Sequence, residues 1–135
     1  MEVLIGVKKI LKERGFKCFL DMEKGGIVVP LRVDDYLAEF LAYEDGNGVR
    51  ALGIVYDVGS AVDRKILEEI LKVPTKFKVS ISLDDDGDLI FDVWHTLVNP
   101  SVENVVGAFI LFTKFVKWLI KSLNGDVKPF LNQEE

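Results

Sequence analysis

Residues 36–56 have the sequence YLAEFLAYEDGNGVRALGIVY, and the centre of this stretch, Asp45-Gly46-Asn47-Gly48, is a strong signal for a β-hairpin turn. Residues 49–56 after the turn have the composition of a strand. Residues 36–44 before it are ambiguous between strand and helix, because Asp34 and Asp35 are suited to cap a helix there. We favour a strand, since the segment runs directly into the hairpin turn.

The turn at 45–48 also predicts how the two strands pair and which side chains share a face. Three pairs are expected on one face: Ala42 opposite Ala51, Phe40 opposite Gly53, and Ala38 opposite Val55. This face is uncharged and carries small residues, so a helix can pack closely on it. The other face is expected to mix apolar, aromatic and charged side chains: Leu37, Glu39, Leu41, Tyr43, Arg50, Leu52, Ile54 and Tyr56.

The second face of the hairpin is too apolar for simple exposure to water. Patches of aliphatic, aromatic and arginine side chains are typical of protein contact surfaces. A half-covered sheet face in a small monomer would carry similar residues, so two interpretations stay open. If this face is a protein contact surface, its candidate interface residues are Leu41, Leu52, Ile54 and Tyr56.

Outward from the hairpin, periodic segments predict a single α+β domain over residues 1–135. Apolar residues at helical spacing indicate helices over 3–14, 61–72 and 100–123, the last with Asn99 as cap and Pro100 as its first residue. Strands are expected over 16–20, 27–33, 76–83 and 88–96 in addition to the hairpin. The predicted order is α-β-β-β-β-α-β-β-α, with the helices packed on a largely antiparallel sheet.

One further segment carries a resemblance to known proteins. Val79-Ser80-Ile81-Ser82-Leu83-Asp84-Asp85-Asp86-Gly87-Asp88-Leu89 is a strand, an acidic glycine turn and the start of a second strand, and a capped C-terminal helix follows. With this segment and its element order, the chain resembles the type III secretion chaperone-like fold and the related YbjN-like proteins of bacteria and archaea. The resemblance covers nearly the whole chain in element order. It implies a dimeric, non-enzymatic protein that binds other proteins, and it supplies no catalytic residues.

Charge and composition exclude several function classes. The chain has 135 residues, 22 acidic and 17 basic, for a net charge of −5, which disfavours binding to a phosphate backbone. Its most apolar run without a charge, residues 104–113, is too short for the roughly 20 residues that span a bilayer. The first seven residues lack the basic start of a signal peptide. We therefore expect a cytoplasmic protein with neither a nucleic-acid nor a membrane partner. Scarce Gln, Cys and Met beside abundant Lys and Glu follow a trend of hyperthermophile proteins.

No residue pattern in the sequence predicts a metal site, a cofactor or an enzyme. The acidic run 84–88 suits calcium, but position twelve of an EF-hand loop would be His95 instead of glutamate, so turn formation explains the run. His95 is the one histidine, and Asp92, three residues earlier on the same expected strand, points to the opposite face. Cys18 is expected to be a buried structural residue.

The final helix is expected to have more apolar surface than one sheet can cover. Its polar stripe is narrow and contains Glu103, Gly107, Lys114, Lys117 and Lys121, while a helix on a sheet needs an apolar arc of only about 100° or a little more. Cover by the first helix and by residues 127–131 is one explanation. Self-association is the other, with these candidate interface residues: Val106, Ile110, Leu111 and Trp118.

Together these patterns favour a homodimeric, protein-binding module with a chaperone-like or adaptor role, which would hold an extended segment or a helix of a partner protein. The alternative is a small-molecule-binding domain or minor enzyme, with a pocket between sheet and helices near Asp92, Trp94 and His95.

Overall fold

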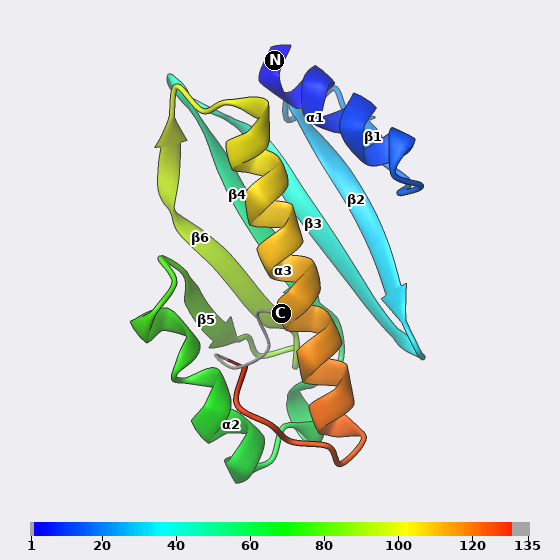
Figure 1. The fold of residues 1–135 in the computed structure, drawn as a ribbon, viewed down its shortest axis with the longest axis vertical. Helices are drawn as coiled ribbons and strands as arrows, with labels where there is room; N and C mark the ends of the chain where they lie inside the picture. Colours follow the sequence, from blue (N-terminus) through cyan, green and yellow to red (C-terminus); the bar gives the residue numbers. More distant parts are fainter. Residues whose placement is uncertain (1, 131–135) are drawn as a thin grey trace.

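The computed structural model describes residues 2–130, except for the side chains of residues 94–97, and it confirms the α+β class. Three helices accompany one sheet (Figure 1): α1 (Glu2–Glu13), α2 (Arg64–Ile70) and α3 (Val102–Leu123). The strands are β1 (Phe19–Asp21), β2 (Gly26–Val33), β3 (Tyr36–Asp45), β4 (Gly48–Val55), β5 (Ser80–Leu83) and β6 (Leu89–Val98). They lie in the order β1-β2-β3-β4-β6-β5, and every neighbouring pair is antiparallel.

The central hairpin of β3 and β4 has the predicted register. Residues 36–45 form a strand, so the helical alternative for this segment is wrong, and Ala42, Phe40 and Ala38 oppose Ala51, Gly53 and Val55. All six of these residues are buried. From Val49 to Val55, buried and half-buried positions alternate along β4, so one face of the sheet is covered and the other is more open.

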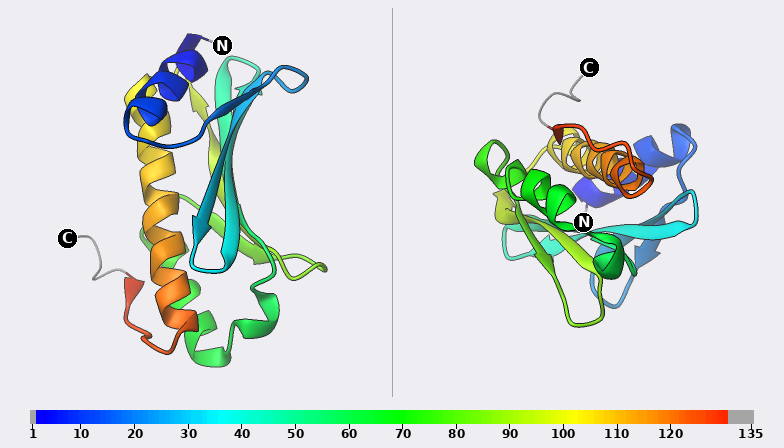
Figure 2. Two further views of the ribbon diagram at one scale, coloured as in Figure 1. Left: turned by 90° about the vertical axis from the view of Figure 1, so that its right-hand side faces the viewer. Right: turned by 90° about the horizontal axis from the view of Figure 1, so that it is seen from below.

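Helices α1 and α3 lie side by side on the covered face (Figure 2). Gly53 lets α3 approach closely, because a Cβ atom at this position would lie only 2.2 Å from the Phe112 ring. The core between the two layers is rich in aromatic rings, with Phe112 packed between Phe40 and Phe91 at centroid distances of 6.2 and 5.6 Å. The small residues of the central hairpin therefore make room for the large ones of α3.

Two predicted strands are shorter than expected, because aromatic side chains leave the sheet to fill the core. The expected strand at 76–83 begins only at Ser80, and Phe77 before it packs against Phe130 with ring centroids 5.9 Å apart. In place of the expected strand at 16–20, β1 begins only at Phe19. Phe16 before it packs edge-on against Phe109, with ring centroids 4.9 Å apart. A single turn of 3₁₀-helix, Val73–Thr75, occupies the connection before Phe77.

Two helix starts also differ from the prediction. Ser101, and not Asn99, caps α3: its hydroxyl accepts from the Asn104 backbone N–H, while the Asn104 side chain accepts from the Ser101 N–H. Asn99 instead adopts a positive φ of 45° in the turn before the helix. Similarly, the Asp63 side chain accepts from Ile66 N–H at 2.9 Å, and α2 begins at Arg64, three residues later than expected.

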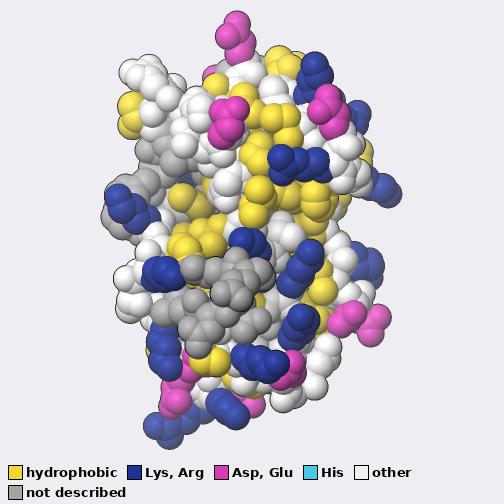
Figure 3. All heavy atoms as spheres, viewed as in Figure 1, with side chains coloured by type: hydrophobic (Ala, Val, Ile, Leu, Met, Phe, Trp, Pro, Cys, Tyr) yellow, Lys and Arg dark blue, Asp and Glu magenta, His cyan; other side chains and the backbone are white. Residues whose placement is uncertain are grey.

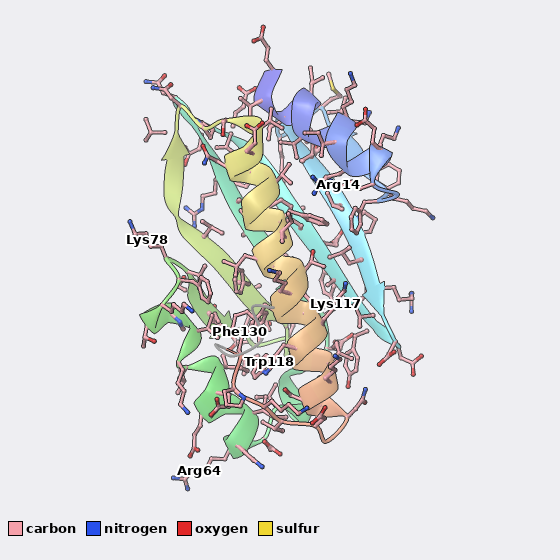
Figure 4. The ribbon with its side chains drawn as sticks, viewed as in Figure 1. Arg14, Arg64, Lys78, Lys117, Trp118 and Phe130 are labelled. Atoms are coloured by element: carbon pink, nitrogen blue, oxygen red, sulfur yellow. The ribbon has the colours of Figure 1, made fainter. Side chains whose placement is uncertain are left out.

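The wide apolar arc of α3 is largely covered within the chain. Trp118 is buried because its ring packs against Phe115 and Phe130, and its indole N–H donates to the Lys128 carbonyl at 2.5 Å (Figure 4). Val106 is also buried. The width of the arc suggested that Val106 and Trp118 would be available to a partner. They are not, because α1 and the segment after α3 cover this side of the helix.

Candidate functional site: the open face of the sheet

The face of the sheet opposite the helices carries apolar side chains from four strands. No helix of the described chain covers it over the central strands (Figure 2). The pairings place Val28, Leu41 and Leu52 in one row across β2, β3 and β4. Pro30, Ile54 and Ile90 lie in the next row, which also contains Glu39. We call this surface the open face and define it by its apolar residues: Val28, Pro30, Leu37, Leu41, Leu52, Ile54 and Ile90.

The open-face side chains are half-buried by their neighbours in the sheet, and Leu37 is 41% exposed. At one edge of the sheet, Phe19 continues the row of Val28 and is 55% exposed. The apolar surface therefore extends from β1 to β6. Strands lie about 4.8 Å apart, so these five strands form a surface about 20 Å wide.

Two polar pairs lie on the same face, and Glu39 and Asp92 belong to the two rows themselves. The Arg50 guanidinium donates to the Asp92 carboxylate at 2.6 Å, and the Tyr56 hydroxyl donates to the Glu39 carboxylate. The hydrogen bond from Arg50 to Asp92 and the negative charge of Asp92 raise the pKa of Arg50. Burial, with the hydrogen bond to Glu39, raises the pKa of Tyr56 to about 12. The raised pKa keeps the Tyr56 hydroxyl a donor to Glu39 up to a higher pH than an ordinary tyrosine hydroxyl.

The ion pair of Arg50 and Asp92 does not use all of its hydrogen-bonding atoms. Arg50 Nε and Asp92 Oδ1 are both buried from water and have no partner within the described chain. Arginine and carboxylate groups commonly join through two parallel hydrogen bonds, whereas this pair uses one. A small shift of either side chain, of the kind that interface formation produces, would allow the second bond.

A cavity of about 540 Å³ lies at the Tyr56 end of the open face. It is lined mostly by charged and tyrosine side chains: Arg32, Asp35, Tyr36, Leu37, Glu39, Tyr56 and Asp57. Its volume lies within the range of small-molecule sites, about 300–1,000 Å³. Its lining contains three carboxylates, Asp35, Glu39 and Asp57, but no histidine, cysteine, serine or lysine.

The structure separates the two sets of candidate interface residues. Leu41, Leu52, Ile54 and Tyr56 come together on the open face and its edge. On the helix side, Val106 and Trp118 are buried, Leu111 is half-buried and Ile110 is 37% exposed. Sequence reasoning did not identify Val28, Pro30 and Ile90 as members of the open face. Asp34 and Asp35 form the two-residue turn between β2 and β3, although they are equally suited to cap a helix, and β6 pairs with β4 across a long connection.

The acidic turn between β5 and β6 is explained by local hydrogen bonds. Carboxylates of Asp84, Asp86 and Asp88 lie within 4.8 Å of one another, the one such grouping among the described residues. Asp84 Oδ1 accepts from the backbone N–H groups of Asp86 and Asp88, each at 2.9 Å. These bonds are those of an aspartate-stabilised turn. Asp88 Oδ1 in turn accepts from the Asp57 backbone N–H at 2.9 Å.

The pocket expected near Asp92, Trp94 and His95 falls largely outside the described structure, because the side chains of Trp94 and His95 are not described. Asp92 itself lies on the open face in its ion pair with Arg50. Within residues 2–130, no helix combines the length and apolar character that crossing a bilayer requires.

No protein-family model matches the chain, and the search of curated proteins finds no match to it.

Proposed function

We propose that the chain is a non-enzymatic protein-binding module of the cytoplasm, with a chaperone-like or adaptor role, which forms a homodimer through the open face. The observation that carries the proposal is the double row of apolar side chains on a sheet face without a covering helix. An exposed apolar patch of this extent, flanked by polar residues, marks an interaction site in soluble proteins.

A dimer through the open face would involve a modest share of the surface of the chain. A standard interface buries about 800 Å² on each partner, which is close to a tenth of the 7826 Å² surface of this chain. Burying a valine, leucine or isoleucine side chain fully stabilises by about 1.5–3 kcal/mol. The half-buried apolar residues of the open face would each add a part of that amount on association.

Few charges interrupt the centre of the open face. Arg50 and Asp92 neutralise each other in an ion pair, and Arg32 and Glu39 have opposite charges, while Asp21 and Asp45 lie at the ends of the same face. Two copies can meet face to face with these central charges balanced when the ends that carry Asp21 and Asp45 are not opposed. Sheets stacked in this way pack about 10 Å apart with interleaved side chains.

A second candidate function follows from the 540 Å³ cavity beside Tyr56, which has the volume of a small-molecule site. Its lining contains one cationic and three acidic residues. That balance favours a small cation as ligand over an anionic metabolite.

The test of the dimer is the molar mass from light scattering at micromolar protein concentration. The wild type should have twice the 15.2 kDa mass of one chain. Leu52→Asp places a charge at the centre of the open face and should yield the single-chain mass. Ile110→Asp, the matched control on the helix side, should remain dimeric. Circular dichroism confirms that each variant is folded. A monomeric wild type, or a folded Leu52→Asp that is still dimeric, would contradict the proposal.

A further inference from the structure

Opposite charges are divided between the two layers of the molecule. The helices and the segments joined to them (residues 2–14, 63–78 and 102–128) contain 13 basic and 7 acidic residues, a net charge of +6. The strands and their turns (residues 15–62 and 79–101) contain 4 basic and 13 acidic residues, a net charge of −9. The acidic chain thus presents a basic helix side, on which lysine and arginine side chains surround exposed apolar atoms (Figure 3).

An apolar groove of about 270 Å³ lies on this basic side, between the end of α1 and the middle of α3. Its floor is built from Leu11, Phe16, Phe109 and Ile110. Leu11 and Phe109 are buried, Phe16 is fixed edge-on against Phe109, and Ile110 is 37% exposed. The floor is therefore a preformed recess that a large apolar side chain can enter.

Three cations form the rim of the same groove. Arg14 follows the end of α1, and Lys117 projects from α3 (Figure 4). Lys114, one turn earlier on α3, is the third. All three are exposed, and none forms an ion pair within the described part of the chain. Their positive charge is therefore available to a ligand.

We infer that this groove binds an acidic segment of a partner protein, with one large apolar side chain in the recess and carboxylates against Arg14, Lys114 and Lys117. This inference rests on the proposed protein-binding function and supplies the chemistry of the bound partner. The groove lies on the helix side of the sheet, so binding there leaves the open face free for the second copy. The chain would hold its partner and its dimer mate on opposite sides of one sheet.

The dimensions of the groove favour a peptide over other anions. Its volume is below the roughly 300–1,000 Å³ of sites that enclose a small molecule, and it suits one or two side chains. Three rim cations on a chain of net charge −5 supply few of the phosphate contacts that bind nucleic acid. A membrane would require protruding apolar residues, whereas Leu11 and Phe109 are recessed.

The test is fluorescence anisotropy with a labelled synthetic peptide of about twelve residues that combines glutamates with leucines at helical spacing. We expect the wild type to bind this peptide and to bind neither its Glu→Gln version nor its Leu→Ser version. Lys114→Glu with Lys117→Glu should weaken binding by about tenfold or more, since both rim charges are reversed. Lys65→Glu with Lys78→Glu, on the α2 end of the helix side, makes the same change in net charge and should leave affinity within about twofold.

Ile110→Ser tests the apolar floor separately, and it should weaken binding by about threefold to tenfold without any change in charge. Equal loss of binding in the rim and control double variants would overturn the inference, because attraction would then be nonspecific. Absence of peptide binding by the wild type would overturn it as well, as would tighter binding of single-stranded DNA or anionic vesicles than of the peptide. Light scattering on the same samples reports the dimer, so failure of the groove and failure of the open face are distinguished.

Discussion

The two faces of the central hairpin differ in the size of their side chains. Toward the helices, β3 and β4 present alanines and Gly53 around one large ring, Phe40, and α3 packs directly on them. Toward the other side they present Leu41, Leu52 and Ile54, which remain half-exposed. Small residues therefore mark the face that receives a helix of the same chain. Large apolar residues in the same strands mark the face that no helix of the described chain covers.

The two faces should differ most in the unfolding free energy that is lost when a large side chain is truncated. Phe112→Ala removes a fully buried side chain that packs against both Phe40 and Phe91, and we expect a loss of about 3–5 kcal/mol of unfolding free energy. Leu41→Ala on the open face should cost only about 1 kcal/mol in urea titrations at submicromolar concentration, where self-association contributes least. Equal losses would show that the open face is as well packed as the core.

A single methyl group should also distinguish a close-packed position from an open one. Gly53→Ala places a Cβ atom 2.2 Å from the ring of Phe112, so the ring must move, and we expect a loss of about 1–3 kcal/mol. Gly107→Ala on α3 is the matched control, because nothing lies within 4 Å of its added Cβ. It should stabilise the protein by about 0.5–1 kcal/mol through helix propensity. A neutral Gly53→Ala in thermal unfolding would contradict the close approach of α3.

Tyr56 gives the open face a dependence on pH. An unfolded tyrosine loses its proton near pH 10, whereas Tyr56 keeps it until about pH 12, so the stability it contributes is complete below pH 10 and is lost as pH rises from 10 to 12. Tyr56→Phe removes this contribution together with the hydrogen bond to Glu39, which is worth about 1 kcal/mol. The difference in stability between wild type and variant should therefore shrink across that window. A constant difference from pH 9 to pH 12 would argue against the raised pKa.

The acidic turn at the edge of the sheet should show the smallest effect. Asp84 Oδ1 already accepts two backbone hydrogen bonds, and the turn lacks the glutamate that completes a calcium loop. Millimolar calcium in place of a chelator should change the melting temperature by less than about 2 °C. A rise of several degrees, abolished by Asp86→Asn, would instead assign a cation site to the turn.

Local sequence signals predicted the elements that depend on neighbouring residues. The turn at 45–48 was sufficient to predict the β3–β4 register, since a turn of known length leaves one pairing that keeps the small residues on one face. The helical spacing of apolar residues, which predicted α1 and α3, is also a local signal. Four of the open-face residues and Tyr56 could be placed for the same reason, because they alternate with the buried positions of this one hairpin.

Features that depend on distant contacts could not be predicted. Phe77 alternates with its neighbours as a strand residue would, yet its contact with Phe130 removes residues 76–79 from the sheet. Trp118 is buried by Phe130 and the Lys128 carbonyl, a segment whose path no local pattern indicates. The open-face residues of β6 depend on its pairing with β4, to which no short turn connects it. Those of β2 follow from the two-residue turn Asp34-Asp35 before β3, a turn obscured in the sequence because both aspartates are also suited to cap a helix.

The reactivity of a single introduced thiol tests most directly whether the open face is covered in solution. Ile54→Cys places the thiol at the centre of the open face, and Ile110→Cys places it on the helix side. The native Cys18 is buried and its thiol pKa is raised by that burial, so it should contribute little background. We predict that maleimide labels Ile54→Cys about tenfold more slowly, or slower still, at ~100 µM protein than at ~0.1 µM, while Ile110→Cys reacts at one rate throughout. A rate for Ile54→Cys that does not change with concentration, or protection of Ile110→Cys in its place, would contradict the account.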